Sequence, residues 1–338
     1  MSDVTQTTIT LPELRLENGT VMRDVAIACQ VAGTLDATGR NAVLLAHGYS
    51  AHHRMMGTGG SWAAMAGPGR AIDTDRFFVV STNMLGSSYG STGPASINPG
   101  TGKPWGPDFP DISLIDQVNA QRLALDQLGV KHLTAIAGVS FGGQLAFQWA
   151  VTHPDFVSGI IPTASAPKGR GDHTLVDTLV ARLARDPNWN GGWFYENGGL
   201  TETLTTMRID NLRSYGMDAV LAAKVADPAK RESMLQRMAE QWAREFDANS
   251  LVVLRRAAVR FNARKDLQRM KARVLYSLST TDTLFPPSIA PDVMAALKTA
   301  GVEAEYFELV SEQGHMAPLT DCGTLAPQVR AFLDRLAP

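Results

Sequence analysis

One pentapeptide constrains the fold of this chain more than any other feature of its sequence. Gly138-Val139-Ser140-Phe141-Gly142 follows the apolar run LTAIAGV and precedes GGQLAFQWAVTH, which has the apolar spacing of a helix. A strand, a sharp turn with small residues on both sides of a serine, and a helix form a strained elbow that projects the hydroxyl from the end of a sheet. The pattern predicts that Ser140 is a nucleophile.

The same glycine-serine-glycine spacing occurs a second time, in Gly86-Ser87-Ser88-Tyr89-Gly90. This copy also follows a strand-like run, but it leads into STGPASINPGTGKPWG. Proline at positions 94, 99 and 104 excludes the helix that an elbow requires. We therefore interpret Ser88 as a loop residue near the site.

Apolar, β-branched runs alternate with helical patterns in both ends of the chain, which predicts a mainly parallel sheet flanked by helices. An antiparallel strand is expected at Val21–Ala32, after a turn at Asn18-Gly19. The other predicted strands are Val43–His47, Phe77–Asn83, Leu133–Val139, Ser158–Thr163, Arg273–Ser279 and Ala304–Val310, and late helices are predicted at Ser288–Thr299 and Thr324–Leu336.

The strand signal disappears between residues 166 and 272, where apolar residues recur at helical spacing. This stretch is expected to be a helical cap inserted into an α/β core made of residues 1–165 and 273–338. An aromatic loop, Asp186 to Gly199, lies between its first helices, and packing of the cap is the simplest role for those aromatic side chains.

Two loops supply partners for Ser140 in the order serine, acid, histidine that the α/β-hydrolase fold uses. Asp282 follows the predicted strand RVLYSLS, and His315 follows the last strand, YFELV. Catalytic groups gather beyond the carboxyl ends of parallel strands. His315 is expected to take the proton of the Ser140 hydroxyl, and Asp282 to hold the imidazole in the required tautomer.

The oxyanion hole of this fold combines the backbone N–H after the serine with one from the loop after an early strand. Those amides belong to Phe141 and Tyr49 here. The nearby His47, His52 and His53 are interpreted as structural or solvent-facing, because the fold takes its base from the C-terminal end of the chain.

Composition limits the partners of this 338-residue chain. Its 31 lysine and arginine residues nearly balance its 33 aspartate and glutamate residues, so nucleic acid and anionic membranes are not expected to bind. Cys29 and Cys322 are far apart in sequence and no metal-ligand spacing appears, which argues against a disulfide scaffold or a metal site. A polar N-terminus without a signal peptide predicts a cytoplasmic protein.

With the elbow, the acid and the histidine in place, the chain resembles the homoserine O-acetyltransferases. The resemblance is strongest from Asn83 to Val130, and it continues through GVSFGG, DPNWNGG, TDTLFPP and GHMAPL, so that it covers most of the chain. The resemblance implies acetyl-CoA as a co-substrate, no other cofactor, and a homodimer formed through the cap. It also implies that Arg208 and Tyr215, seven residues apart in MRIDNLRSY, hold an amino-acid acceptor, although an ordinary basic and aromatic pair on a cap helix fits equally well.

The sequence departs from that family at three points. Met316 follows the histidine where the family usually has aspartate to meet the acceptor's ammonium, the loop reads GSS at 86–88 where Gly-Gly-Cys is common, and the oxyanion loop reads HGYS. Because an ammonium buried without its carboxylate costs several kcal/mol, on the order of 3–5, we expect hydrolysis of small carboxylic esters or thioesters. Homoserine acetylation is the alternative, and a non-catalytic binding protein on a hydrolase scaffold is a third hypothesis.

Overall fold

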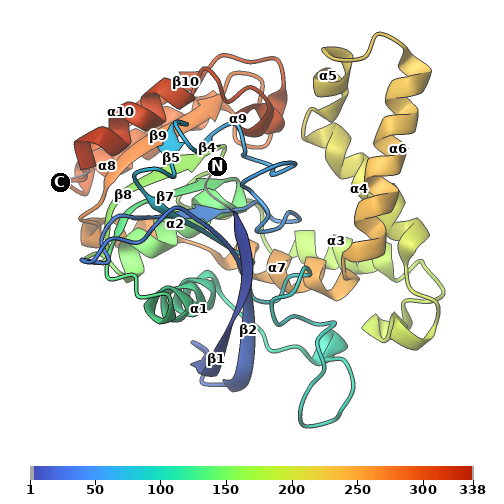
Figure 1. Cartoon of the computed structure of the whole chain (residues 1–338). Helices are drawn as coiled ribbons and strands as arrows, with labels where there is room; N and C mark the ends of the chain where they lie inside the picture. The colour runs from blue at the N-terminus through green and yellow to red at the C-terminus, as the bar shows by residue number, and fades with distance from the viewer. Residues whose placement is uncertain (1–3, 337–338) are drawn as a thin grey trace.

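The computed structural model describes residues 4–336, which form a central sheet covered by helices on both faces and a separate group of helices to one side (Figure 1). The sheet has eight strands in the order β1-β2-β6-β3-β7-β8-β9-β10. Pairing is antiparallel from β1 to β6 and parallel from β6 to β10, so the predicted mainly parallel sheet is confirmed. The strands are β1 (Thr5–Arg15), β2 (Val21–Ala32), β3 (Ala42–Ala46), β6 (Phe78–Thr82), β7 (Leu133–Val139), β8 (Val157–Thr163), β9 (Arg273–Ser279) and β10 (Ala304–Leu309), beside a two-stranded pair of β4 (Ala66–Gly67) and β5 (Ile72–Asp73).

Both faces of the sheet are buried, which explains why its central strands are continuous apolar runs in the sequence. In β3, Leu44 packs into one core cluster with helices α1 (Leu114–Gln127), α2 (Phe141–Thr152) and α8 (Ala290–Thr299). Its neighbours Val43 and Leu45 point to the opposite face, where α10 (Ala326–Leu336) and the segment from Met55 to Ile72 cover them. The sheet therefore positions the ends of β3, β7, β9 and β10 within one rigid layer.

Strand β1 was not predicted from the sequence. It pairs with β2 along most of its length at the edge of the sheet, and the turn at Asn18-Gly19 lies between the two strands as expected. Most of its residues are exposed, and it contains Pro12, which a strand tolerates at a sheet edge. With only one buried face, β1 lacks the apolar run by which the other strands were recognised.

Between residues 166 and 272 the described chain is helical. It contains α3 (Thr174–Leu183), α4 (Thr201–Ser214), α5 (Met217–Ala222), α6 (Pro228–Glu245) and α7 (Ala248–Arg260), and the short α9 (Ala317–Thr320) follows later in the chain. Helices α3 to α6 stand apart from the sheet in Figure 1, whereas α7 contributes Leu254 and Ala257 to the main core. The boundaries 166 and 272 stay a prediction, since α7 belongs to the packing of both parts.

Two further findings bear on the expectations about composition. Cys29 and Cys322 are both buried and free. No helix within residues 4–336 is both long enough and apolar enough to cross a membrane.

Candidate active site

Ser140 lies at the turn between β7 and α2 with a backbone φ of 58° and ψ of −117°. This left-handed φ is strained for a residue with a side chain. A Cβ at Gly138 would lie 2.2 Å from the carbonyl oxygen of Gly142, and a Cβ at Gly142 would lie 1.9 Å from that of Ala46. Both flanking positions therefore require glycine, as the elbow pattern predicted, and the Ser140 amide donates to the carbonyl of Thr163 at 2.9 Å.

Ser88 has none of this geometry. No helix occurs in residues 83–105 around it, and its Oγ accepts a hydrogen bond of 2.8 Å from the amide of Asp247 in the segment leading into α7. The side chain thus ties the long loop after β6 to the cap region.

Asp282 and His315 meet beyond the ends of β9 and β10. Nδ1 of His315 lies 2.8 Å from Oδ2 of Asp282, and both side chains are buried. The other carboxylate oxygen accepts from the amides of Leu284 and Phe285 at 2.7 and 3.0 Å. Burial opposes ionisation of Asp282, but the hydrogen bond and charge of His315 and these two amides outweigh it, so its pKa is lowered.

The ring of His315 contacts two aromatic side chains that sequence reasoning did not assign to this role. Phe285 stacks on it with ring centroids 5.8 Å apart, and Tyr215 lies on it at 5.4 Å. The turn bearing Tyr215 approaches the histidine loop closely, because the Tyr215 carbonyl accepts from the Met316 amide at 3.1 Å. No hydrogen bond joins Ser140 to His315 in the described chain, and such bonds often tighten only when substrate binds.

Tyr49 and Phe141 border Ser140 on the expected sides. Both line a cavity with Ser140, and their ring centroids are 6.3 Å apart. A Cβ at Gly48, the residue before Tyr49, would lie 3.9 Å from that of Ser140. Phe141 is the first residue of α2, where backbone N–H groups have no partner within the helix. The assignment of these two amides to an oxyanion hole stays a prediction.

The three histidines near this loop lie where burial keeps them neutral. Burial lowers the pKa of His47 to about 3 and the pKa values of His52 and His53 to about 4. His47 lines the site, but its Nδ1 donates to the Gly48 carbonyl at 2.9 Å and its Nε2 accepts from the Met84 amide at 3.3 Å. Its two ring nitrogens are thereby engaged by backbone groups, which supports a structural role.

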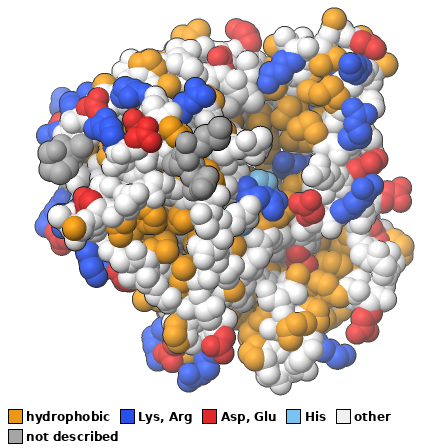
Figure 2. Space-filling view, in the orientation of Figure 1, with side chains coloured by type: hydrophobic (Ala, Val, Ile, Leu, Met, Phe, Trp, Pro, Cys, Tyr) orange, Lys and Arg blue, Asp and Glu red, His pale blue; other side chains and the backbone are white. Residues whose placement is uncertain are grey.

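Two cavities meet at Ser140 between the core and the cap helices. One, of about 190 Å³, extends along His315 and Met316 to Arg208, and we call it the Arg208 cavity. The other, of about 170 Å³, extends past Phe141 to Arg255, and we call it the Arg255 cavity. Tyr49 and Tyr215 line both. Figure 2 shows the molecule hollowed between the two bodies, with both basic and acidic side chains near the rim.

The structure brings Arg208, Tyr215 and Met316 to the same cavity as Ser140 and His315. Arg208 reaches from α4 to the core, where one guanidinium nitrogen donates to Ser50 Oγ at 2.7 Å, and its guanidinium lies 4.9 Å from the centre of the Trp242 ring. Its Nε is buried without a hydrogen-bond partner among residues 4–336. An oxygen of a bound molecule would satisfy that donor, so the cavity favours an acidic or polar group at this end.

Neither cavity is lined by an aspartate or a glutamate within the described part of the chain. Around Met316 the Arg208 cavity is apolar instead, with Met55, Leu212, Met217, Met238 and Leu319 among its walls. A positively charged group bound there would have no carboxylate partner.

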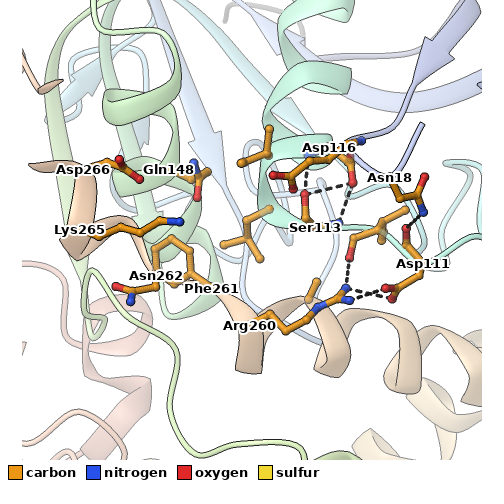
Figure 3. Close-up of a pocket in the computed structure, with 15 residues that line it drawn as sticks. Asn18, Asp111, Ser113, Asp116, Gln148, Arg260, Phe261, Asn262, Lys265 and Asp266 are labelled. Atoms are coloured by element: carbon orange, nitrogen blue, oxygen red, sulfur yellow. Dashed lines mark hydrogen bonds and ion pairs between the residues drawn. The ribbon is translucent and has the colours of Figure 1, made fainter. Parts of the chain in front are cut away.

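A third hollow, of about 360 Å³, lies away from Ser140 and is lined by residues of α1, α7 and the segment after α7 (Figure 3). Its polar groups serve the fold. Asp111 pairs with Arg260, and Asp116 caps α1 through Ser113 and accepts from the Glu17 amide at 2.7 Å. The Ser113 hydroxyl donates to the Asp116 carboxylate at 3.0 Å as part of the capping box of α1, so we assign no chemistry to this hollow.

Comparisons with known proteins agree with this geometry. A family model described as the α/β hydrolase fold matches residues 41–321. A homoserine O-acetyltransferase of Haemophilus influenzae is 35% identical over 339 residues, covering 94% of this chain and 95% of that protein. The crystal structure of esterase E22 superposes with a TM-score of 0.88 at 26% identity, covering 98% of this chain and all of that one. A homoserine O-acetyltransferase from Bacillus anthracis superposes with a TM-score of 0.89 at 26% identity, covering 99% of each chain.

Proposed function

We propose a function from the premise that this chain belongs to the homoserine O-acetyltransferase-like group of the α/β-hydrolase family. It transfers small acyl groups through an ester on Ser140 and gives them mainly to water. The family is one of enzymes, so the hypothesis of a non-catalytic binding protein is not pursued. The proposal differs from the activity named for the relatives in the acceptor of the acyl group, which is water here and homoserine there.

In the proposed mechanism, Ser140 Oγ attacks the carbonyl carbon of the substrate while His315 takes the hydroxyl proton. The amides of Tyr49 and Phe141 stabilise the oxyanion, and the leaving alcohol or thiol departs with the proton from His315. Water then attacks the acyl-enzyme, His315 takes a proton from that water, and the acid is released as the proton returns to Ser140. Asp282, with its lowered pKa, remains ionised and stabilises the imidazolium in both steps.

A single observation carries the choice of water: no carboxylate lines either cavity within residues 4–336, and the residue after His315 is a methionine. Homoserine carries an ammonium that would lose its hydration in the Arg208 cavity without gaining a partner. An acceptor that is not held beside the ester loses its proximity advantage. Water, which is far more concentrated than homoserine, then attacks the acyl-enzyme more often. Similarity to esterase E22 supports the same conclusion.

Homoserine O-acetylation is the second candidate, and a specific observation favours it. Arg208 and Tyr215 both line the cavity at Ser140, and the buried Nε of Arg208 lacks a partner in the described chain. A carboxylate at this position fits an amino-acid acceptor. The relatives named as homoserine O-acetyltransferases point the same way.

The deciding measurement is the ratio of free acetate to O-acetylhomoserine formed from acetyl-CoA, or from an activated acetate ester, in the presence of homoserine. We expect mostly acetate. A wild type that makes mostly O-acetylhomoserine would establish the second candidate and reject the hydrolase.

The covalent step is tested separately with a fluorophosphonate probe and mass spectrometry. The label should be found on Ser140, and Ser140→Ala should lose several orders of magnitude in kcat. Ser88→Ala is the matched control and should remain active, because Ser88 only accepts a hydrogen bond from the Asp247 amide. A label on Ser88 would overturn the assignment of the nucleophile.

A further inference from the structure

The Arg255 cavity contains two cationic side chains that the mechanism above does not use. Arg255 projects from α7 and Arg170 lies on the segment after β8, and both line this cavity together with Ser140 and Gln144. No carboxylate lies within 4 Å of either guanidinium among residues 4–336. The cavity therefore presents two positive charges beside the proposed nucleophile with no protein group to neutralise them.

Several neighbouring arginines have acidic partners, unlike this pair. On the same cap and its borders, each of four arginines has an acidic partner: Arg182 with Asp210, Arg213 with Glu232, Arg260 with Asp111, and Arg264 with Asp292. The chain thus supplies carboxylates where arginines serve to hold elements together. Arg170 and Arg255 have no such partner in the described chain, and neither do Arg185, Arg237 and Arg256, which do not line this cavity.

Aromatic side chains hold both guanidinium groups at the cavity walls. Arg255 is half-buried with its guanidinium 4.6 Å from the centre of the Tyr49 ring, and that of Arg170 lies 5.5 Å from the centre of the Phe285 ring. Tyr49 carries a proposed oxyanion amide, and Phe285 stacks on His315. Contact with an aromatic face fixes the position of a guanidinium. Arg255 also makes a side-chain hydrogen bond with Tyr49, which leaves its remaining N–H groups for a ligand.

We propose that Arg170 and Arg255 form a subsite for an anionic oxygen group, a carboxylate or a phosphate, carried by the acyl donor that reacts with Ser140. The proposal deepens the function proposed above and rests on it. Guanidinium groups bind both kinds of oxyanion through paired N–H donors. Arg255 is half-buried, which strengthens its interaction with an anion, whereas Arg170 is exposed. The anion could lie on the acyl chain, as in a monoester of a dicarboxylic acid, or on the leaving group, as in the phosphates of a coenzyme A thioester.

Two substrate pairs distinguish these sources by kcat/KM. Monomethyl succinate is compared with methyl butyrate by methanol release, which isolates a carboxylate on the acyl chain. Acetyl-CoA is compared with S-acetyl-N-acetylcysteamine by thiol release, which isolates the phosphates. Within each pair, the uncharged member serves as the reference for the amount of active protein, so the ratio reports only recognition of the anion.

In Arg170→Gln and in Arg255→Gln, we expect the charged-to-neutral ratio to fall about ten-fold or more for one of the two pairs, as the loss of a charged hydrogen bond predicts. Arg255→Lys should recover part of that loss, because it restores the charge without the fork of N–H donors. Arg256→Gln is the matched control: Arg256 is the next residue on α7, is exposed and does not line this cavity, so both ratios should be unchanged.

A fall in the succinate ratio identifies a carboxylate, and a fall in the acetyl-CoA ratio identifies phosphate. If neither ratio falls in either glutamine variant, the subsite does not exist, whereas turnover of the neutral ester would still support the proposed hydrolase. If the neutral ester is not turned over at all, the function fails and the subsite is judged by binding alone. Isothermal titration of the Ser140→Ala variant with succinate or coenzyme A must then show affinity that Arg255→Gln weakens about ten-fold, and equal affinity with and without Arg255 rejects the subsite.

Discussion

At the scale of single residues, the candidate site depends on a strained backbone and on side chains that fix one another. The φ of 58° at Ser140 persists because the glycines on both sides leave space that no side chain could share. The position of the His315 ring is determined by a carboxylate on its edge, by the stacked ring of Phe285 and by the tilted ring of Tyr215. We therefore expect the geometry around His315 to tolerate loss of charge at Asp282 while its chemistry does not.

The first prediction concerns Asp282→Asn. The amide preserves shape, but its NH₂ group favours the imidazole tautomer in which Nε2 carries the proton, so the base cannot accept the proton of Ser140. We expect kcat for ester hydrolysis to fall by about four orders of magnitude. The free energy of unfolding at neutral pH should also fall, because the lowered pKa of Asp282 means that its ionised form stabilises the folded state.

Asp292→Asn is the control for that variant, since Asp292 is exposed and pairs with Arg264 at the surface. Its kcat should stay near that of the wild type. Near-normal turnover of Asp282→Asn would show that another carboxylate orients His315.

At this scale, the sequence could predict site residues that belong to short local motifs, but not contacts between distant segments. Ser140, Asp282 and His315 could each be located because a short motif sits at the end of a strand, and order along the chain supplied the rest. The contacts of Phe285 and Tyr215 with the His315 ring, and the approach of Arg255 to Ser140, join segments far apart in sequence. Such contacts depend on how the cap packs against the core, and no local pattern encodes them.

At the scale of elements, the sequence predicted the central strands of the sheet, whose faces are both buried, and missed the edge strand β1 and the two-residue strands β4 and β5. Strands β2, β7 and β9 begin and end at the predicted residues, whereas β1 was overlooked because its polar residues and Pro12 resemble a loop. The helices of the 166–272 region were expected as a group. Their ends depend on caps such as Asp247 before α7, whose side chain accepts from the Ser250 amide at 2.9 Å.

The second prediction concerns the stability of the protein, which should depend on pH through the Asp247 cap of α7. Burial raises the pKa of Asp247 from 3.8 to about 6, against the lowering effect of its hydrogen bonds. Between those pH values the native state binds more protons than the unfolded state, so this group's contribution to stability is present at low pH and is lost as pH rises through 6. The loss between pH 5 and 7.5 should be about 1 kcal/mol.

Asp247→Asn removes this titration and keeps a side-chain oxygen for the cap. The free energy of unfolding of the variant minus that of the wild type, measured by urea denaturation, should therefore be about 1 kcal/mol larger at pH 7.5 than at pH 5. Asp227→Asn is the matched control, because Asp227 also caps a helix, α6, but is exposed. A difference that is equal at both pH values would show that Asp247 is ionised throughout the range.

At the scale of the whole molecule, the site belongs to neither part of the chain alone. The core supplies Ser140, Asp282 and His315, and α4 supplies Arg208, which is anchored to the core through Ser50. Sequence order could predict an α/β core with a helical insertion, but not that two cavities would meet at Ser140. A homodimer formed through the cap, which the family resemblance implies, stays a prediction.

We propose that the acceptor is selected in the Arg208 cavity, where core and cap meet, and Met316→Asp tests this proposal. Met316 lines the Arg208 cavity directly after His315, so a carboxylate there would lie in the same cavity as Arg208 and Tyr215. If those two side chains hold the carboxylate end of homoserine, the new aspartate can meet its ammonium, and the restored pair should raise the ratio of O-acetylhomoserine to free acetate about ten-fold. The gain should be larger for homoserine than for butanol, which has no charge to recognise.

Met238→Asp places the same charge on another wall of the cavity, from α6, and should leave the ratio unchanged. An equal rise in both variants would mean that added negative charge, rather than its position beside His315, selects the acceptor, and no rise in Met316→Asp would mean that Arg208 and Tyr215 do not hold homoserine in this protein.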